Sequence, residues 1–471
     1  MIVCIDCGLT NGKVLLFAED GRCLAQVAFP TPLDGVIIDT CALENALTEA
    51  VRSLLQQNLE PPAEITCVCV SGHGNGLYAL GDHGPWPVGY SSMVTESTPY
   101  VPASAITAPI TYQSAWAGQP LAILAWLKAE YPAKYRSIRQ ILFCKDLLRW
   151  FMTGTAATEL TDASAAGLIN IRTAQYDRTL LSLYGLEDAW DKLPPLTRSD
   201  AVAGHVTPAF AAKTGLPVNT PVLAGLFDVN SCMLGAGVID QDHYSMTAGT
   251  WGINAAASSN PVNSDQITQC CLFYGALPYV LIDSAPTSCV NLEWFLQQLM
   301  PGVSYEAANQ IVAAQRPDEL LLYLPYLYPP MDRPGLAAEF VGLRSHHTKG
   351  AMLRAVYEGI VLEHRRRLSK LQQLGYERPQ IVLSGGAAKS PVFAQMFADI
   401  CGKEVLIPAQ SQAGAMGGVL LSQMAAHRYN NLHQASEALI RYAAVYRPDS
   451  SMQSYYTQSF RRFCSIVERR P

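Results

Sequence analysis

The sequence predicts an α/β protein made of two lobes, residues 1–240 and 241–471, each opening with a β-hairpin. First, 471 residues are too many for a single hydrophobic core. Second, residues 2–17 and 244–255 both read as a strand, a tight turn rich in Gly and Thr, and a second strand. Third, helical and strand patterns alternate after each hairpin without a long linker, so we expect the lobes to pack closely around a cleft.

The first half begins with three strands, a helix and a fourth strand. A turn at Asp20-Gly21 precedes a third strand over Cys23–Phe29. Helical spacing of apolar residues predicts a helix over Leu43–Asn58, and Ile65–Val70 reads as a buried strand. This order differs from the β-α-β start of a doubly wound dinucleotide fold. Three helices and a further buried strand are predicted at 121–131, 137–153, 161–166 and 221–228.

The second half repeats the opening order. After its hairpin, a strand is predicted near 279–283, followed by helices over 290–299 and 349–374. A strand at 381–384 runs into Gly385-Gly386-Ala387, and the small residues of Gly414–Gly418 open a closely packed helix. The recurrence of a hairpin followed by strands and helices favours two lobes of related architecture.

Composition excludes several classes of function. The net charge is −6 and no run is dense in Lys or Arg, which argues against a nucleic-acid partner. No apolar run reaches the 18–20 residues or so that span a bilayer, and the N-terminus lacks the features of a secretory signal. The 13 cysteines are scattered through apolar runs, as is typical of reduced thiols. We therefore expect a cytoplasmic enzyme that acts on a small-molecule substrate and has no membrane partner. A homodimer is one assembly that the sequence allows.

The first hairpin carries the residues of an anion cradle. A turn of this kind points backbone N–H groups toward one point, and Gly8 allows a phosphate to approach the backbone. Thr10, Asn11 and Lys13 can donate to phosphate oxygens, while Asp6 would face a bound Mg²⁺. The alternative is an ordinary hairpin with a turn glycine. The second hairpin offers the same pattern at Gly249 and Thr250, and two facing hairpins would clamp a polyphosphate.

Two further segments are candidates for the same site. Gly385, Gly386 and Ala387 follow a strand and precede a helix, where small residues allow close approach of a flat ligand or phosphate. Asp228 ends a buried strand at the start of a helix, so it is either an N-cap or a general base. Phosphoryl transfer to a hydroxyl needs one proton acceptor and otherwise mainly positioning. Asp228 fits that role, since it lies just before the lobe boundary.

His73 follows a strand and is flanked by Gly72 and Gly74, so it is either a buried structural histidine or a substrate contact. Its Gly-rich segment lacks the G-x-G-x-x-G spacing of a dinucleotide loop, which disfavours a nicotinamide-dependent dehydrogenase. No Walker A motif occurs in the chain either.

Taken together, these segments resemble the FGGY family of carbohydrate kinases, within the actin/hexokinase superfamily, over essentially the full length. The segments that carry the resemblance are Asp6-Cys7-Gly8 with Lys13, 225–229, 249–251, 284–288, 291–295, Gly385-Gly386 and 414–417. The order and spacing of the set are specific. The likeness is greatest to the bacterial L-xylulose kinases of that family.

The resemblance implies two RNase H-like lobes with mixed sheets around a central ATP/sugar cleft. It implies ATP and Mg²⁺ as cofactors, with Asp228 as general base and Asp6 and Asp228 at the metal. Thr10 and Thr250 would serve the phosphates, and Gly385–Ala387 the adenosine. On the sugar side it implies His73, Gly74, Gln113, Trp116 and Asp228, and a ketopentose such as L-xylulose as acceptor.

One segment departs from the family pattern. Met93 and Val94 stand where an Asp and an Arg usually bind sugar hydroxyls, and Glu96 has a different spacing. The acceptor is therefore open to another ketose, a polyol or a sugar acid. An actin-like ATP- or sugar-binding protein with little kinase activity is a second hypothesis, against which the intact Asp228 speaks.

Overall fold

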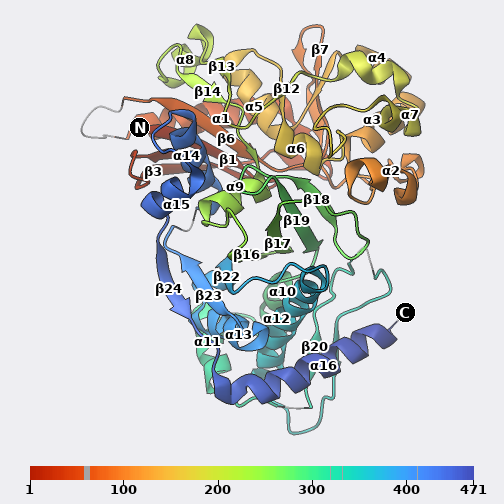
Figure 1. Cartoon of the computed structure of the whole chain (residues 1–471), viewed down its shortest axis with the longest axis vertical. Helices are drawn as coiled ribbons and strands as arrows, with labels where there is room; N and C mark the ends of the chain where they lie inside the picture. The colour runs from red at the N-terminus through yellow and green to blue at the C-terminus, as the bar shows by residue number, and fades with distance from the viewer. Residues whose placement is uncertain (58–63, 319, 331–332, 411, 471) are drawn as a thin grey trace.

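The computed structural model describes residues 1–57, 64–318, 320–330, 333–410 and 412–470. Two seven-stranded mixed sheets form the centres of the upper and lower halves of the molecule (Figure 1). This architecture confirms the predicted two-lobed α/β fold. The assignment of lobe bounds at 1–240 and 241–471 stays a prediction.

The first sheet has the order β13-β14-β6-β1-β2-β3, with β15 also paired to β6. Strands β1 and β2 form the first hairpin, and β1 pairs in parallel with β6. The strands are β1 Ile2–Cys7, β2 Asn11–Phe17, β3 Cys23–Pro30, β6 Cys67–Gly72, β13 Val202–His205, β14 Pro221–Leu223 and β15 Leu226–Phe227. The parallel strands bring their carboxyl ends to one edge of the sheet, where ligands bind in open α/β sheets.

The second sheet has the order β18-β19-β17-β16-β22-β23-β24. Its hairpin, β16–β17, lies at the centre, and β16 pairs in parallel with β22. The strands are β16 His243–Ala248, β17 Gly252–Ser258, β18 Gln269–Leu272, β19 Tyr279–Ala285, β22 Gln380–Ser384, β23 Glu404–Pro408 and β24 Tyr442–Tyr446. Both sheets therefore place a hairpin beside a parallel neighbour whose carboxyl end adjoins the turn.

Helices and small strand pairs surround these sheets. The helices are α1 Thr40–Leu55, α2 Ser104–Thr111, α3 Pro120–Glu130, α4 Pro132–Ser137, α5 Cys144–Thr153, α6 Leu160–Ala165, α7 Arg178–Leu183, α8 Pro208–Thr214, α9 Asp228–Gly235, α10 Val290–Leu299, α11 Tyr305–Ala314, α12 Lys349–Gln373, α13 Pro391–Cys401, α14 Ala413–Ala425, α15 Leu432–Leu439 and α16 Gln453–Arg469. The short strands are β4 Leu33–Asp34, β5 Ile37–Asp39, β7 Tyr78–Gly81, β8 Gly84–Pro85, β9 Val88–Tyr90, β10 Gln140–Leu142, β11 Thr158–Glu159, β12 Leu196–Thr197, β20 Leu322–Leu324 and β21 Glu339–Val341.

Helix α14 comes late in the chain but packs against the first sheet (Figure 1). Its glycines allow this close approach: a Cβ on Gly417 would lie 2.1 Å from the Ser231 carbonyl oxygen of α9, and one on Gly418 would lie 3.1 Å from Cys4 Sγ of β1. The predicted closely packed helix is confirmed, and its partner is the other half of the molecule.

One predicted helix is wrong. The sequence predicts a single helix over residues 137–153, whereas the structure has strand β10 and then helix α5. Residues 140–142 pair antiparallel with β7, and Asp146 accepts a hydrogen bond from the Phe143 N–H at the start of α5. Strand pairing with a distant segment thus outweighs the local helical spacing. The predicted helix over 43–58 corresponds to α1, and its last residue, Asn58, lies outside the described residues.

No helix in the described ranges is both long enough and apolar enough to cross a bilayer.

Candidate active site

The first hairpin presents Asp6 and Lys13 directly opposite each other, near the ends of β1 and β2. The turn closes with a hydrogen bond of 3.0 Å from the Gly8 N–H to the Asn11 carbonyl oxygen. Asp6 Oδ1 accepts a hydrogen bond of 2.8 Å from Ser71 Oγ, on the parallel strand β6. The hairpin therefore holds a carboxylate and an ammonium group at the carboxyl edge of the sheet.

Asp228 reaches the same edge because of a backbone detail. Gly225 has φ of +85°, and a Cβ there would lie 1.9 Å from the Val70 carbonyl oxygen, so only glycine fits. The chain then forms β15 beside β6 and turns into α9 at Asp228. Asp228 Oδ1 accepts a hydrogen bond of 2.7 Å from the Val229 N–H, which leaves Oδ2 for a further partner.

A cavity of about 470 Å³ joins the two hairpins. Five predicted residues line it: Asp6, Gly8, Asn11, Lys13 and Asp228. The residues that sequence reasoning missed are Ala28, Val229, Cys232, Ser245, Thr247 and Ile253. Ser245 and Thr247 alternate along β16, and this polar alternation on a buried strand is a signal that could have identified them.

Both carboxyl groups of this cavity have raised pKa values. Burial, followed by the negative charge of Asp6, raises the pKa of Asp228 to about 7. Burial raises the pKa of Asp6 as well, against the hydrogen bond from Ser71 and the charge of Lys13. Two carboxyl groups at one cavity offer the oxygen ligands that suit a hard divalent cation.

The turn tips lie between residues that line this cavity. Thr10 is exposed and accepts a hydrogen bond from Asn11 Nδ2 at 3.3 Å. Thr250 is exposed, and the Gly249 carbonyl accepts a hydrogen bond of 2.8 Å from the Cys289 N–H. Neither Thr10, Gly249 nor Thr250 belongs to the cavity wall in the described structure.

A second cavity, of about 320 Å³, follows the end of β22. Gly386 and Ala387 line it together with aromatic side chains, and the rings of Tyr357 and Phe393 stack 4.0 Å apart. Gly385 has φ of +86° and makes the sharp turn out of β22 without lining the cavity. A hydrogen bond of 2.9 Å between Thr247 Oγ1 and Ser384 Oγ links the strands that lead to the two cavities.

The predicted sugar-side residues separate into different environments. His73 is buried, its Nε2 lies 3.0 Å from the Tyr78 hydroxyl, and burial lowers its pKa to about 4. A Cβ on Gly74 would lie 2.4 Å from the Phe227 ring, so this loop packs against the residue that precedes Asp228. Neither residue lines the cavity between the hairpins or the cavity beside Gly386.

Gln113 is also buried, and both polar atoms of its side chain form a hydrogen bond. Its Nε2 donates to the Ser164 carbonyl at 2.7 Å, and its Oε1 accepts from Gln119 Nε2 at 3.1 Å. Its backbone forms a bridge with Gln269 of β18, so Gln113 connects the two halves of the molecule.

Trp116, by contrast, lines a third cavity of about 330 Å³. Trp251, from the tip of the second hairpin, lines the same cavity and is 51% exposed. The remaining lining residues are Ser114, Ala115, Asp265, Gln266, Ile267, Thr268, Asp283, Ser284, Pro286 and Lys370. The structure thus brings one aromatic side chain from each half to a common cavity, and Trp251 is the one that sequence reasoning missed.

A buried ionic cluster supports the segment before Asp228. Lys145 Nζ lies 3.0 Å from Asp162 Oδ2, 3.2 Å from Asp146 Oδ1 and 3.7 Å from Glu159 Oε2. The neighbouring Thr161 Oγ1 accepts a hydrogen bond of 3.0 Å from the Phe227 N–H. The start of α6 therefore fixes the backbone that delivers Asp228.

Asp318, His346 and His347 also bring three potential metal ligands together. His347 Nδ1 accepts a hydrogen bond of 2.8 Å from the Arg344 N–H, so Nε2 carries the ring proton. That Nε2 lies 3.0 Å from Asp318 Oδ2 and donates to it. A protonated ring nitrogen cannot bind a metal, and we interpret this cluster as a hydrogen-bonded loop.

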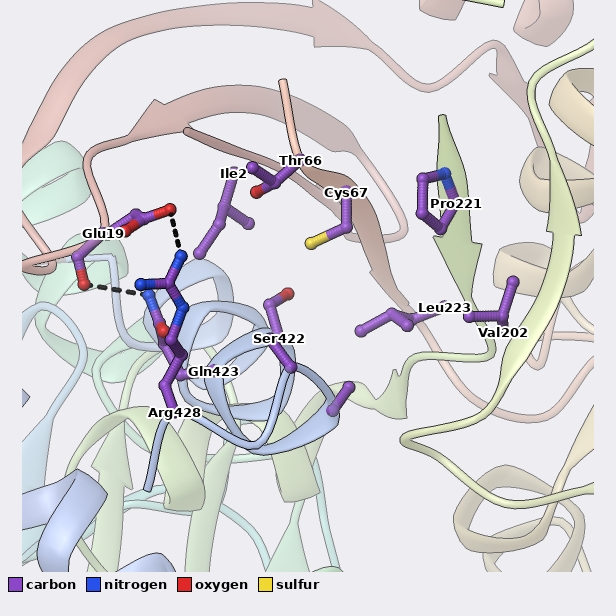
Figure 2. A pocket seen from close by; sticks show the side chains of 12 residues that line it. Ile2, Glu19, Thr66, Cys67, Val202, Pro221, Leu223, Ser422, Gln423 and Arg428 are labelled. Atoms are coloured by element: carbon purple, nitrogen blue, oxygen red, sulfur yellow. Dashed lines mark hydrogen bonds and ion pairs between the residues drawn. The ribbon is translucent and has the colours of Figure 1, made fainter. Parts of the chain in front are cut away.

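A small cavity of about 150 Å³ lies at the opposite end of the first sheet (Figure 2). Ile2 and Cys67, which line it, begin the parallel strands β1 and β6, whereas Asp6 and Asp228 lie at the carboxyl ends. Its location separates it from the candidate site.

Comparison with known proteins identifies the class. The N-terminal domain of the FGGY family of carbohydrate kinases matches residues 1–235, and the C-terminal domain of that family matches residues 244–426. The chain therefore belongs to the FGGY family of carbohydrate kinases, which are phosphotransferases.

Individual relatives are similar over nearly their whole length. A probable L-xylulose kinase of Haemophilus influenzae is 30% identical over 98% of both chains. An L-xylulose/3-keto-L-gulonate kinase of Escherichia coli is 28% identical over 98% of this chain and 96% of its own. The crystal structure of a xylulose kinase from Rhodospirillum rubrum has a TM-score of 0.89 at 21% identity, covering 99% of this chain and 98% of the other, and supports the fold.

Proposed function

We propose that this carbohydrate kinase transfers the terminal phosphate of ATP to a hydroxyl group of a ketopentose such as L-xylulose. The observation that carries the proposal is the cavity in which Asp6, Lys13 and Asp228 meet the strands of the second hairpin. The names of the relatives from H. influenzae and E. coli support the choice of acceptor.

Asp228 is the proposed general base. Its Oδ1 is occupied by the Val229 N–H, so Oδ2 is the oxygen that would take the proton of the attacking hydroxyl. Thr10 and Thr250 would donate to the phosphates from the two turn tips, together with Asn11 and Lys13. The missing side chains of Gly8 and Gly249 would let the phosphates approach the backbone. The cavity lined by Gly386 and Ala387 would take the adenosine, and Gly385 would make the turn that leads to it.

Asp6 and Asp228 are the proposed ligands of Mg²⁺, with Asp6 acting through water. When bound, the cation would neutralise charge on the phosphate oxygens. The raised pKa values of both carboxyl groups support this assignment, because a nearby cation would favour their charged forms.

Replacing the proposed base tests the mechanism. Asp228→Asn keeps the shape of the side chain but removes its basicity, and we expect a loss of about 10²–10⁴-fold in kcat. Binding of ATP, measured by calorimetry, should change much less. If Asp228→Asn phosphorylates its best acceptor at the wild-type rate, Asp228 is not the base.

The acceptor itself needs a separate experiment. Met93 is 53% exposed and Val94 is buried, so neither offers the ionic contacts of the usual Asp and Arg. We propose that the sugar contacts come instead from Trp116, from Gln113 through its backbone, and from the His73–Gly74 loop. ATP consumption measured over pentuloses, hexuloses, pentitols and aldonates would identify the acceptor. Turnover of acids alone would contradict a ketopentose.

A further inference from the structure

Helix α14 begins beside the first hairpin, and its first turn is held there from two sides. A Cβ on Gly414 would lie 2.5 Å from Asp6 Oδ2, so the helix backbone touches the Asp6 side chain closely. Ser231 Oγ of α9 donates a hydrogen bond of 2.7 Å to the Gly414 carbonyl oxygen. Gln412 is the residue that precedes this turn, and it makes no capping bond to the helix through its side chain.

The Gln412 side chain instead reaches the first hairpin. Its Oε1 accepts a hydrogen bond of 2.9 Å from Lys13 Nζ on β2. Its Nε2 donates to Gln26 Oε1, on β3, at 3.4 Å. An ammonium group can only donate, so this pair of contacts fixes the amide with its oxygen toward Lys13.

Without that contact Lys13 has another partner close by. Asp6 is the residue directly opposite Lys13 in the hairpin, and opposed residues of an antiparallel pair carry their side chains on one face. The lysine stem is long and flexible enough to turn onto the Asp6 carboxylate. Such a pair would neutralise the two charges that the cavity offers to a phosphate chain and its cation.

We propose that Gln412 is a positioning residue for phosphate-donor binding: it holds Lys13 Nζ toward the cavity and away from Asp6. The inference rests on the proposed function, since it assumes that the first hairpin binds the phosphates of ATP. It gives the late helix α14 a direct part in a site whose charged residues belong to the first half of the chain.

A double-mutant cycle with Lys13 tests this role. The variants are Gln412→Met, Lys13→Met and the double variant, and the readout is the Kd of a non-hydrolysable ATP analogue with Mg²⁺ by calorimetry. Methionine matches the length of glutamine and keeps most of the apolar stem of lysine, but it cannot make the bond. We expect each single variant to weaken binding by about tenfold, and the double variant to bind no more weakly than Lys13→Met.

Gln423 provides the matched control on the same helix. It also bonds the first half of the chain, through a 2.9 Å hydrogen bond from its Nε2 to the Glu19 carbonyl oxygen (Figure 2). Gln423→Met likewise removes a side-chain amide contact to the first half of the chain, but at the far end of α14, away from Lys13. We expect it to leave the Kd of the ATP analogue unchanged.

Three outcomes would overturn the proposal: equal weakening by Gln412→Met in both Lys13 backgrounds, an unchanged Kd, or the same weakening by Gln423→Met. In turnover assays the KM for ATP should rise while the KM for the acceptor stays constant. If Gln412→Met fails to fold, Gln412→Ala takes its place, with the same expected and contradicting results. The binding assay needs no acceptor, so a failure of the proposed sugar reaction would not be mistaken for a failure of this inference.

Discussion

The Asp228 carboxyl group combines two tasks that a single environment must satisfy. Burial and the neighbouring Asp6 charge raise its pKa to about 7, which places it where a proton can be accepted and later released near neutral pH. An isolated carboxyl group at a helix start would be far more acidic. The sequence shows Asp228 at a strand end, but the proximity of Asp6 depends on β1 and β15 flanking β6, which only the folded sheet reveals.

This environment predicts the pH dependence of the reaction. The base must be unprotonated, so kcat/KM should fall about tenfold per pH unit below about pH 7 and level off above it. Asp6→Asn removes the second cause of the raised pKa of Asp228. The acidic limb of the variant's pH–rate profile should therefore move to lower pH, whatever the absolute rate of the variant. Rates of acceptor phosphorylation between pH 5.5 and 9 provide the measurement. A limb that stays in place in Asp6→Asn would contradict the role of the Asp6 charge.

Helix α6 and the start of α5 support the site through buried charges. Two cations, Lys145 and Arg149, face three carboxyl groups, those of Asp146, Glu159 and Asp162. Burial lowers the pKa of Lys145, but its three acidic neighbours outweigh this and raise it. Burial, against the charge of Lys145, raises the pKa of Asp162 to about 7. The cluster therefore holds α5 and α6 together with three carboxyl groups against two cations, so one carboxyl group has no cation of its own.

That balance predicts opposite effects for two substitutions. Lys145→Met leaves buried carboxylates without their cation and should destabilise the fold by about 3–5 kcal/mol. Asp162→Asn removes the excess carboxyl group and should cost little or nothing at pH 8. Melting temperatures of the two variants and wild type compare them directly. Equal destabilisation by both would contradict the ionic balance.

Asp162 also predicts how the stability of the fold changes with pH. The folded-state pKa of Asp162 lies above its unfolded value, so the folded state holds the proton longer, and Asp162 lowers stability as pH rises from about 4 to about 7. The melting temperature of Asp162→Asn should therefore decline less over that range than that of wild type. Identical slopes would show that Asp162 is already ionised at the lower pH.

At the scale of the whole molecule, two hairpins from distant parts of the chain face one cavity. The sequence predicts both hairpins, because a strand, a Gly-rich turn and a second strand are local patterns. It also predicts most helices, for example α10 and α12. It does not predict the pairing of β10 with β7 or the packing of α14 against the first sheet, because these depend on partners far away in sequence.

The shared cavity predicts that one ligand protects both hairpins. A phosphate chain that contacts the two turns should slow amide hydrogen exchange at residues 8–11 and 249–252 together. Hydrogen exchange with and without the magnesium complex of a non-hydrolysable ATP analogue measures this. Asp6→Asn, with weaker ligand binding, should lose protection at both turns in parallel. Protection limited to one turn would contradict a clamp between the hairpins.

The packing of α14 against the first sheet also has a consequence for biosynthesis. Residues 413–425 cover a face of β1 and β6, which are among the first strands to leave the ribosome. That apolar face, with Ile2, Cys4 and Cys69, lacks the cover of α14 until most of the chain has been translated. A nascent chain must therefore keep its first sheet shielded or loosely formed until then, and chains ending before residue 413 should depend on chaperones to stay in solution.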